Sequence, residues 1–448
     1  MKPLLFFGLF LFLISCSKDF EVVSTEQEPQ TAFLGELEFV RSYGGSGEDT
    51  ARAIIETSDG GYAILGYSNS TDGDLQGKTL AVNDYWLSKL DAQGELQWSK
   101  TYGGSKDDRG QGLVQTQDGG YALTGYAMSD DGDGSVNNGF HDNWILKVDA
   151  QGVIEWEKSY GFSGHDHSYD ILDTGDGGFF FTGFLDITSA RADGNTEKRN
   201  TIASHGVGEF WGTKIDSKAK VQWRGYYGGT NNDRAHAAVR ADDGGYVMAG
   251  FTESDDFDIN NSRGSYDFWV VKIDEGGELV WQQTFGGTGI ERAQDIAKTT
   301  DGGYVIIGNT FSADVDISEN HGESDIWLIK VDGDGNLLWN RSFGGTQFDD
   351  AQSVTTSKDG GFIISGNSKS SDGDANLNAG ENDIWLLKTD AQGEMVWQKS
   401  FGGSGLDFGF DALETSSGAI VLVGEMASAD FMEISNKGAS DIVVIKMK

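Results

Sequence analysis

The stretch SDGGYAILGYS, Ser58 to Ser68, joins a tight turn to an alternating strand. Asp59-Gly60-Gly61 is typical of a hairpin turn, because glycine reaches positive φ and aspartate bonds its own backbone. Variants of the stretch recur about every 58 residues, and they begin at Gln117, Gly175, Asp242, Thr300, Lys358 and Ser416. Self-similarity at such a period predicts a repeat architecture.

Each unit contains four short segments rich in β-branched and aromatic residues. In the first unit they are ARAIIET from Ala51, YAILGYS from Tyr62, DYWLSKLD from Asp84 and ELQWSKTY from Glu95. Turn residues bound every segment, which is the pattern of strands. Tight turns alternate with longer polar connections, and a four-stranded meander of this size predicts one blade of a β-propeller.

The two ends of the chain predict how the ring closes. Residues 35–43 match the fourth strand of the unit, and residues 441–448 match the third. The sequence therefore predicts an all-β, seven-bladed β-propeller in which the N-terminal strand completes the last blade. A linear solenoid is the alternative, but it would leave a broken unit and an open strand edge at each end.

Composition limits the classes of partner. The chain has 448 residues, with 71 acidic against 33 basic side chains and a formal net charge of −38. Such a charge disfavours nucleic acid and anionic lipid, and it favours cations or cationic partners. Cys16 is the sole cysteine, so no disulfide is expected to hold the propeller together.

The N-terminal residues have the composition of an export signal. Lys2 precedes an apolar run that is short for a membrane span and that ends in Leu13-Ile14-Ser15-Cys16. This tetrapeptide resembles the lipobox of bacterial lipoproteins, and the resemblance implies cleavage before Cys16 and lipidation of its thiol. We therefore expect a signal peptide at 1–15, a flexible tether at 16–33 and the propeller at 34–448, anchored to the cell envelope at the outer membrane. An ordinary signal peptide is the alternative.

The twelve tryptophans occupy two positions of the repeat. Six lie in the third strand (Trp86, Trp144, Trp211, Trp269, Trp327, Trp385) and six in the fourth (Trp98, Trp156, Trp223, Trp281, Trp339, Trp397). A residue type that recurs at one position of every unit indicates packing between blades. The recurring third-strand pattern D-x-W-x-x-K, as in Asp84 and Lys89, is likewise interpreted as structural.

Two partial resemblances follow from these repeats. KLDAQGELQW from Lys89 and its copies resemble the tryptophan-docking motif of quinoprotein-like propellers, which implies the propeller fold; the missing cysteine pair does not favour a quinone cofactor. VDGDGNLLWN from Val331 resembles the bulb-type lectin motif at Asp334, Asn336 and Leu338. The motif's glutamine and tyrosine positions hold Asp332 and Asn340, which does not favour mannose binding.

Acidic side chains concentrate in the longer connections. One acid follows each YGGS-like turn (Asp49, Asp108, Asp166, Asp233, Glu291, Asp349, Asp407), where it either rings the channel mouth or bonds loop amides. D-x-D pairs occur in five long loops (Asp72 and Asp74, Asp131 and Asp133, Asp256 and Asp258, Asp314 and Asp316, Asp372 and Asp374). Closely spaced carboxylates suit Ca²⁺, and solvated turns explain them equally well.

The third unit departs from the repeat, and a departure is where a specific function is expected. It has a longer loop from Asp186, and five of the six histidines lie in or near it: His141, His165, His167, His205 and His236. His165, Asp166, His167 and His205 are the candidate ligand-binding residues, since imidazoles with a carboxylate bind transition metals or act as acids and bases. Accidental surface histidines are the alternative.

No catalytic triad, phosphate loop or nucleophilic cysteine is evident in the sequence. We therefore expect a lipid-anchored envelope protein with a binding or scaffolding role, whose ligand is a protein or a glycan on the long-loop face. A polysaccharide hydrolase or lyase at the channel mouth and a lectin-like sugar-binding module are the alternatives.

Overall fold

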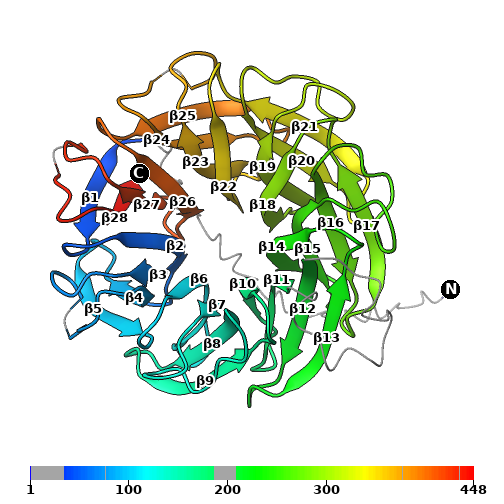
Figure 1. The fold of residues 1–448 in the computed structure, drawn as a ribbon. Helices are drawn as coiled ribbons and strands as arrows, with labels where there is room; N and C mark the ends of the chain where they lie inside the picture. The colour runs from blue at the N-terminus through cyan, green and yellow to red at the C-terminus, as the bar shows by residue number, and fades with distance from the viewer. Residues whose placement is uncertain (2–34, 76, 186–207, 376, 433) are drawn as a thin grey trace. The chain divides into compact units, whose positions relative to one another are not determined.

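Seven four-stranded antiparallel sheets stand around a central axis, and each sheet is one unit of the sequence repeat (Figure 1). The architecture is that of a seven-bladed β-propeller, as predicted. It is seen in a computed structural model, which describes all residues except 2–34, 76, 186–207, 376 and 433. Cys16, the expected signal peptide and tether, and His205 lie outside the described residues.

In six blades the strands run outward from the axis in sequence order, and in the seventh β26, β27 and β28 are followed by β1 at the outside. The innermost strands are β2 (Asp49–Glu56), β6 (Asp108–Gln115), β10 (Asp166–Asp173), β14 (Asp233–Arg240), β18 (Glu291–Lys298), β22 (Asp349–Thr356) and β26 (Asp407–Glu414). The second strands are β3 (Tyr62–Ser68), β7 (Tyr121–Ala127), β11 (Phe179–Leu185), β15 (Tyr246–Thr252), β19 (Tyr304–Thr310), β23 (Phe362–Ser368) and β27 (Ile420–Met426).

The third strands are β4 (Asp84–Leu90), β8 (Asp142–Val148), β12 (Glu209–Ile215), β16 (Asp267–Ile273), β20 (Asp325–Val331), β24 (Asp383–Thr389) and β28 (Asp441–Met447). The outermost are β5 (Leu96–Tyr102), β9 (Ile154–Tyr160), β13 (Val221–Tyr227), β17 (Leu279–Phe285), β21 (Leu337–Phe343), β25 (Met395–Phe401) and β1 (Leu37–Tyr43).

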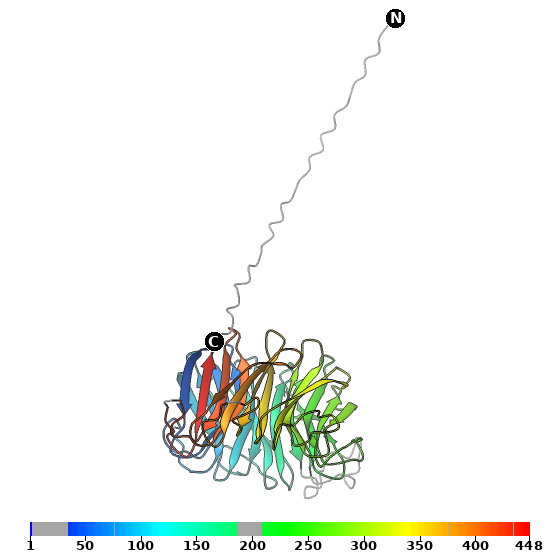
Figure 2. The same ribbon diagram turned by 90° about the horizontal axis from the view of Figure 1, so that it is seen from above.

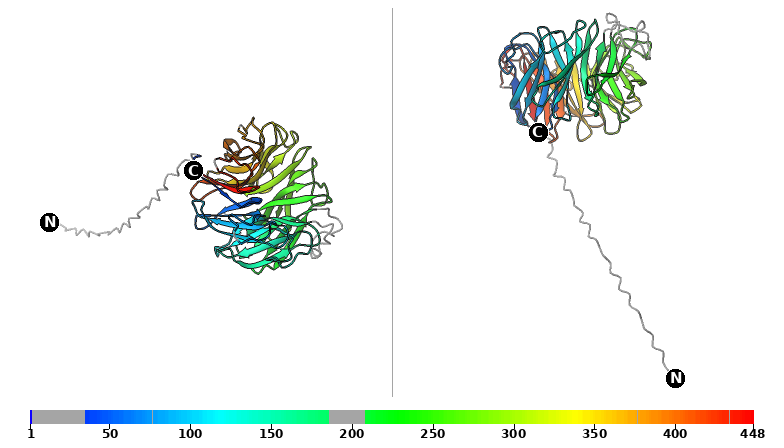
Figure 3. Two further views of the ribbon diagram at one scale, coloured as in Figure 1. Left: turned by 60° about the vertical axis from the view of Figure 1, so that its left-hand side comes forward. Right: turned by 90° about the horizontal axis from the view of Figure 1, so that it is seen from below.

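Pairing of the first strand with the last closes the ring. β1 runs antiparallel to β28, with Tyr43 opposite Ile442, and Glu36 and Lys448 exchange two backbone hydrogen bonds of 3.0 Å. The chain therefore enters and leaves the propeller at the face that carries the tight turns. Figure 2 shows the C-terminus at that face, with the long loops at the opposite one, and Figure 3 gives two further views. We call the face that carries the long loops the long-loop face.

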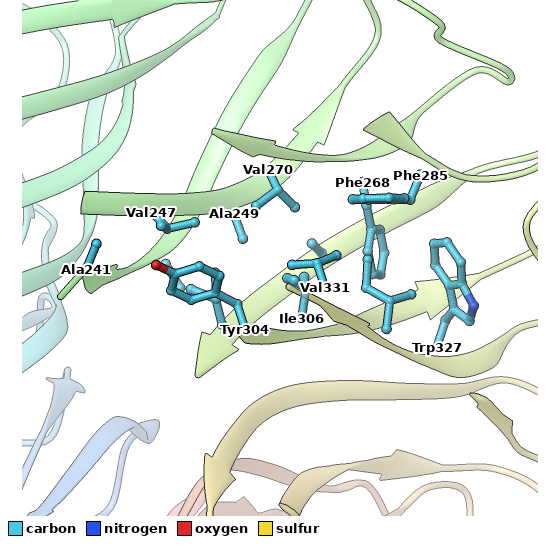
Figure 4. Close-up of a cluster of buried hydrophobic side chains, with 14 of the residues drawn as sticks. Ala241, Val247, Ala249, Phe268, Val270, Phe285, Tyr304, Ile306, Trp327 and Val331 are labelled. Atoms are coloured by element: carbon cyan, nitrogen blue, oxygen red, sulfur yellow. The ribbon is translucent and has the colours of Figure 1, made fainter. Parts of the chain in front are cut away.

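The hydrophobic core lies between neighbouring blades. Between the fourth and fifth blades, Phe268 of one blade packs against Trp327 of the next with ring centroids 4.6 Å apart, and Tyr304 and Ile306 lie in the same cluster (Figure 4). Trp327 is fully buried, as are its five third-strand counterparts. Burial of large aromatic and aliphatic side chains is the main stabilising term, so the tryptophans belong to the scaffold, as predicted.

The D-G-G turn also belongs to the scaffold. In the fifth blade, Thr299 and the Gly303 amide donate hydrogen bonds to Asp301, and the third-strand Lys330 lies 2.5 Å from the same carboxylate. The hydrogen bonds from Lys330 and Thr299 lower the pKa of Asp301 to about 2. The lysine of the D-x-W-x-x-K pattern therefore pairs with the turn of its own blade, and the pattern's aspartate lies at the other end of the strand.

The fourth-strand tryptophans dock on glycines of the next blade. Gly277 has φ of 82°, which glycine adopts readily, and a Cβ atom there would lie 2.7 Å from the Trp223 ring. The Trp223 indole donates a 2.9 Å hydrogen bond to the Glu275 carbonyl of the same turn. This contact explains the glycine of this turn in the other blades; in the third blade Ala219 takes its place, with φ of 59°.

Among the described residues there is no helix with the length and apolar character that crossing a bilayer requires.

Truncation of the N-terminus tests the ring closure. Removing residues 17–30 should leave the melting temperature nearly unchanged, because β1 remains. Removing residues 17–43 takes away β1 and exposes the edge of β28, so the protein should melt at a lower temperature and aggregate. Thermal unfolding and light scattering of the two truncations make the comparison, and equal melting temperatures would show that β1 does not hold the ring.

Candidate functional site

A ring of seven side chains, one from each blade, lines the central channel. Each belongs to the residue at a β-bulge in the innermost strand; in β2, for example, Ala51 and Ala53 pair with β3 while Arg52 is skipped. A bulge redirects a side chain out of the regular alternation. The seven residues enclose a cavity of about 210 Å³ and are Arg52, Gln111, Tyr169, His236, Gln294, Gln352 and Phe410.

These channel residues differ from blade to blade, unlike the scaffold around them. The ring combines one cation, three amides, two aromatic rings and one imidazole, and it includes no carboxylate. His236 donates from Nδ1 to the Ala293 carbonyl at 2.9 Å, and burial lowers its pKa to about 4. The cavity therefore offers neutral hydrogen-bonding groups and the single charge of Arg52.

Arginines stacked on aromatic rings surround the channel entrance on the long-loop face. The guanidinium of Arg52 lies 4.4 Å from the Phe410 ring centroid, and that of Arg109 lies 4.9 Å from the Tyr67 centroid. Two further pairs continue the arrangement, with Arg234 4.2 Å from Phe184 and Arg292 4.8 Å from Tyr266. Cation–π contacts of this kind hold the guanidinium plane. We call this set the arginine–aromatic mouth. Arg109 also donates from Nε to Asp107 at 2.9 Å, and Arg234 donates from Nε to Asn232 at 2.9 Å.

Three histidines converge at the junction of the second and third blades, beside this mouth. His141 precedes β8, His165 precedes β10, and the two are joined by an isolated parallel β-bridge; His167 is the second residue of β10. Nδ1 of His141 lies 2.9 Å from Nε2 of His167 and 3.1 Å from Nδ1 of His165. The Tyr126 ring stacks on His167 with centroids 3.9 Å apart.

The environment keeps two of these imidazoles uncharged at neutral pH. Burial, and secondarily the neighbouring His165, lower the pKa of His141 to about 4. Burial together with His141 and His165 holds the pKa of His167 well below its ordinary value. A neutral imidazole keeps one lone pair, which is the form that binds a metal or accepts a proton.

The acids that follow the YGGS-like turns hold loops together. All seven are buried, and each accepts the backbone N–H of the residue four positions earlier. Asp349, for example, accepts from Gly345 at 2.7 Å and from the hydroxyls of Ser368 and Ser370 at 2.5 and 2.8 Å. This placement favours the interpretation that these acids bond loop amides.

The D-x-D acids bind the same loops from the other side. Asp372 accepts from the backbone N–H of Thr346 at 2.8 Å, and Asp374 accepts from that of Gly344 at 3.3 Å. The other four pairs make the equivalent bonds. Within the described part of the chain, these acids form no group of three ligands within 4.8 Å, whereas His141, His165 and His167 do. Calcium binding by the pairs stays a prediction.

A third group of buried acids lies at the start of the third strands. In six of them one carboxylate oxygen has no hydrogen-bond partner: Asp84, Asp142, Asp267, Asp325, Asp383 and Asp441. Burial raises the pKa of Asp441 to about 6, and the nearby acids Asp49 and Asp74 add to the shift, while Lys437 opposes it. A basic side chain of the protein lies beside some of these acids; for example, Lys78 Nζ lies 2.5 Å from the Asp84 carboxylate.

Sequence reasoning found part of this site. His165, Asp166 and His167 do lie together, but Asp166 accepts the Phe162 amide at 2.6 Å and serves the loop. His141 joins them from the preceding blade, although it is not one of the four candidate ligand-binding residues expected from the sequence. The sequence analysis did not identify the channel residues, which lie three positions after the repeated acid, or the other arginines of the mouth, which lie one position after it. Both positions vary between blades where the repeat is otherwise uniform, and this variation is the signal that could have found them. The lectin-like residues Asp334 and Asn336 form the ordinary turn between β20 and β21.

The comparisons with known proteins give distant structural similarity only. No protein-family model matches the chain, and no curated protein matches it. The WD40 domain of Pan2 from Neurospora crassa is 10% identical, with 90% of this chain and 89% of that one covered and a TM-score of 0.48. YCF48, solved with a D1 peptide, is 12% identical over 93% and 97% of the two chains with a TM-score of 0.46. A protein of unknown function from Bacteroides caccae is 11% identical over 70% and 89%, with a TM-score of 0.38.

The raised pKa of Asp441 predicts a pH-dependent effect of Asp441→Asn. Between the ordinary pKa and about 6 the folded state binds more protons than the unfolded state, so this group's contribution to stability falls as pH rises. Asp441→Asn should therefore melt about 2 °C above the parent at pH 7.5 and equally with it near pH 4. The control is Asp301→Asn, which should destabilise at pH 7.5, because Asp301 has a lowered pKa. If Asp441→Asn lowered the melting temperature equally at both pH values, the raised pKa of Asp441 would be contradicted.

The calcium prediction is tested at Asp372 and Asp374. A specific site there should make Ca²⁺ raise the melting temperature more than Mg²⁺ does in about 0.15 M salt, because Mg²⁺ gives up water reluctantly. Asp372→Asn combined with Asp374→Asn should remove that difference, since amide oxygens still accept the loop N–H groups but carry no charge. Equal responses to the two ions would leave these acids with the loop role alone.

Proposed function

We propose that the protein is a binding protein of the cell envelope that takes an acidic glycan at the arginine–aromatic mouth, with one sugar residue in the central channel. The observation that carries this proposal is the alternation of guanidinium groups and flat rings at the channel entrance. This proposal specifies the ligand of the expected binding protein. It places the ligand at the mouth rather than on the acidic loops, because the carboxylates of those loops already accept hydrogen bonds from the loop backbone.

The chemistry of the mouth fits carboxylated sugars. A guanidinium presents a planar fork of donors that matches a carboxylate, and a ring behind it fixes the plane of the fork. Arg52 is placed in this way, since it stacks on Phe410 and donates a 3.1 Å hydrogen bond to the Tyr67 hydroxyl. Aromatic faces also supply the apolar surface against which the C–H face of a sugar ring packs.

The channel supplies groups that recognise hydroxyls. Gln111, Gln294 and Gln352 each carry an amide with both donors and an acceptor, and a sugar hydroxyl likewise donates and accepts. The 210 Å³ cavity is small, which suits one sugar residue rather than a folded protein segment. The ring gives this end of the ligand a defined orientation, because Arg52, Tyr169, His236 and Phe410 are each the only residue of their type in it.

Envelope anchoring through Cys16 is part of the proposal. The lipobox-like residues Leu13 to Cys16 support it, and the propeller begins at the tight-turn face, opposite the mouth. A lipid at Cys16 would keep the binding protein at the membrane surface without using any residue of the mouth.

A polysaccharide lyase or hydrolase is the second candidate function. It is favoured by one observation, the Tyr169 hydroxyl 3.2 Å from Nδ1 of His167, which places two proton-carrying groups near an arginine-lined cavity. The pair of carboxylates that most glycoside hydrolases use is not found among the seven channel side chains. Burial raises the pKa of Tyr169, so the phenol stays protonated at neutral pH and suits hydrogen bonding to a ligand.

Calorimetric titration with oligosaccharides tests the binding function. Uronate-containing oligomers should bind more tightly than neutral oligomers of equal length, and Arg52→Gln should weaken uronate binding at least about tenfold by removing a charge-assisted contact. The matched control is Arg341→Gln, because Arg341 also stacks on a ring, Trp339, but lies on the outermost strand β21. It should bind as the parent does.

The other outcomes are equally informative. Absence of binding to both kinds of oligosaccharide, or tighter binding of acidic peptides, would overturn the glycan proposal. Shortened or unsaturated oligosaccharides, detected by mass spectrometry after incubation, would establish the second candidate.

A further inference from the structure

We propose that His141, His165 and His167 form a binding site for one divalent transition-metal ion of the borderline class, with Zn²⁺ as the representative. One ring nitrogen from each of the three histidines lies within 4.8 Å of the other two. The closest approaches are those of His141 Nδ1 to His167 Nε2 and to His165 Nδ1. Imidazole nitrogen is a preferred ligand of Zn²⁺, Cu²⁺ and Ni²⁺ and a poor one for Ca²⁺ and Mg²⁺. The site is independent of the glycan proposal and of the D-x-D pairs.

Hydrogen bonding alone does not explain this convergence. Nδ1 of His141 lies 2.9 Å from one imidazole nitrogen and 3.1 Å from another. In a neutral imidazole each nitrogen is either a donor or an acceptor, with one hydrogen or one lone pair in the ring plane. His141 can therefore make one good hydrogen bond, and its second close contact is unsatisfied. A metal ion satisfies all three nitrogens at once, because each then directs its lone pair at one cation.

The protonation states agree with this geometry. Charging the cluster would place two or three imidazolium groups in contact, and burial already lowers the pKa values of His141 and His167. Metal binding requires the neutral ligand, so no proton has to be displaced from these two residues at neutral pH. Nitrogens at the usual Zn–N distance lie about 3.3 Å apart in a tetrahedral site, so the nitrogens now 2.9 and 3.1 Å apart would separate by a few tenths of an ångström. The widest pair of the group, within 4.8 Å, would have to close to the same separation, a movement that the exposed ring of His165 can supply.

Neighbouring groups hold the ligands in place. The second nitrogen of His167, Nδ1, lies 3.2 Å from the Tyr169 hydroxyl, and a metal-bound histidine commonly donates its other N–H to such an oxygen. Tyr126 stacks on the His167 ring. The backbone is fixed as well, because His141 and His165 form a β-bridge at the starts of β8 and β10. Tyr169 is therefore a positioning residue for the metal and is also part of the channel lining.

The site is open to solvent on one side. His165 is exposed, whereas His141 and His167 are partly buried. Three protein ligands leave the fourth position of a tetrahedral ion for water or for an oxygen of a bound ligand. The ion would add positive charge near Arg109, at the edge of the same mouth.

Zinc titration of the full chain tests the site, in a Cys16→Ser background so that no thiol competes. Calorimetry should give one Zn²⁺ per chain, and His165→Ala should weaken binding at least about tenfold by removing one of three ligands. His165 is exposed, so this variant should keep the parent's melting temperature without metal. The matched control is His321→Ala, since His321 is a loop histidine at another blade junction, bonded to Asp325 at 2.6 Å. It should bind zinc as the parent does.

Two further measurements separate ligation from a structural role. Tyr169→Phe should weaken zinc binding by about tenfold, because the acceptor for His167 Nδ1–H is lost while the ring is kept. Ca²⁺ and Mg²⁺ should neither bind at this stoichiometry nor displace zinc. The proposal is overturned if the parent binds no zinc, or if His165→Ala and His321→Ala bind it as the parent does.

Discussion

The buried carboxylate at the start of each innermost strand is the interaction on which the long-loop face depends. It accepts the backbone amide of the loop that arrives from the previous blade and, in the blade that begins at Asp349, the hydroxyls of Ser368 and Ser370 as well. Burial of a charged group is costly, and these hydrogen bonds offset part of that cost; burial still raises the pKa of Asp349 above its ordinary value. In six of the seven blades the carboxylate also bonds the long loop of its own blade, so within the described residues these acids tie together the loops at the channel entrance.

This constraint explains where the blades are allowed to differ. The side chain of the repeated acid points into the loops, and the bulge that follows turns the residue three positions later into the channel. The side chain at the bulge faces the channel and is not part of the hydrophobic core between the blades, so its identity is less restricted. The seven channel positions have therefore diverged to Arg, Gln, Tyr, His and Phe while the scaffold positions stayed nearly constant.

The same distinction decides what the sequence could predict. Trp327, Asp301 and Gly277 recur in every or nearly every blade, and repetition with strand periodicity is sufficient to place them in a closed seven-bladed ring. The position of Arg52 in the channel could not be predicted in this way. Strict alternation along β2 assigns each side chain to one face of the sheet, and the register shift between Ala51 and Ala53 changes that assignment at Arg52. His141 and His167 are 26 residues apart and come together across a blade junction, which depends on loop conformation rather than on a local pattern.

The net charge of −38 has to be reconciled with the acidic ligand that we propose. Charges separated by more than about 8 Å are largely screened at physiological ionic strength, so the distant acids mainly slow the approach of an anion. At contact, the ligand meets Arg52, Arg234 and Arg292, whose guanidinium groups lie on ring faces that exclude water from one side. A charge-assisted hydrogen bond gains strength in such a partly dry site, whereas the scaffold carboxylates nearby already accept N–H and O–H groups and their charge is partly neutralised by those dipoles. Local contacts therefore determine which anion stays bound, and the overall charge disfavours polyanions that cannot enter the mouth.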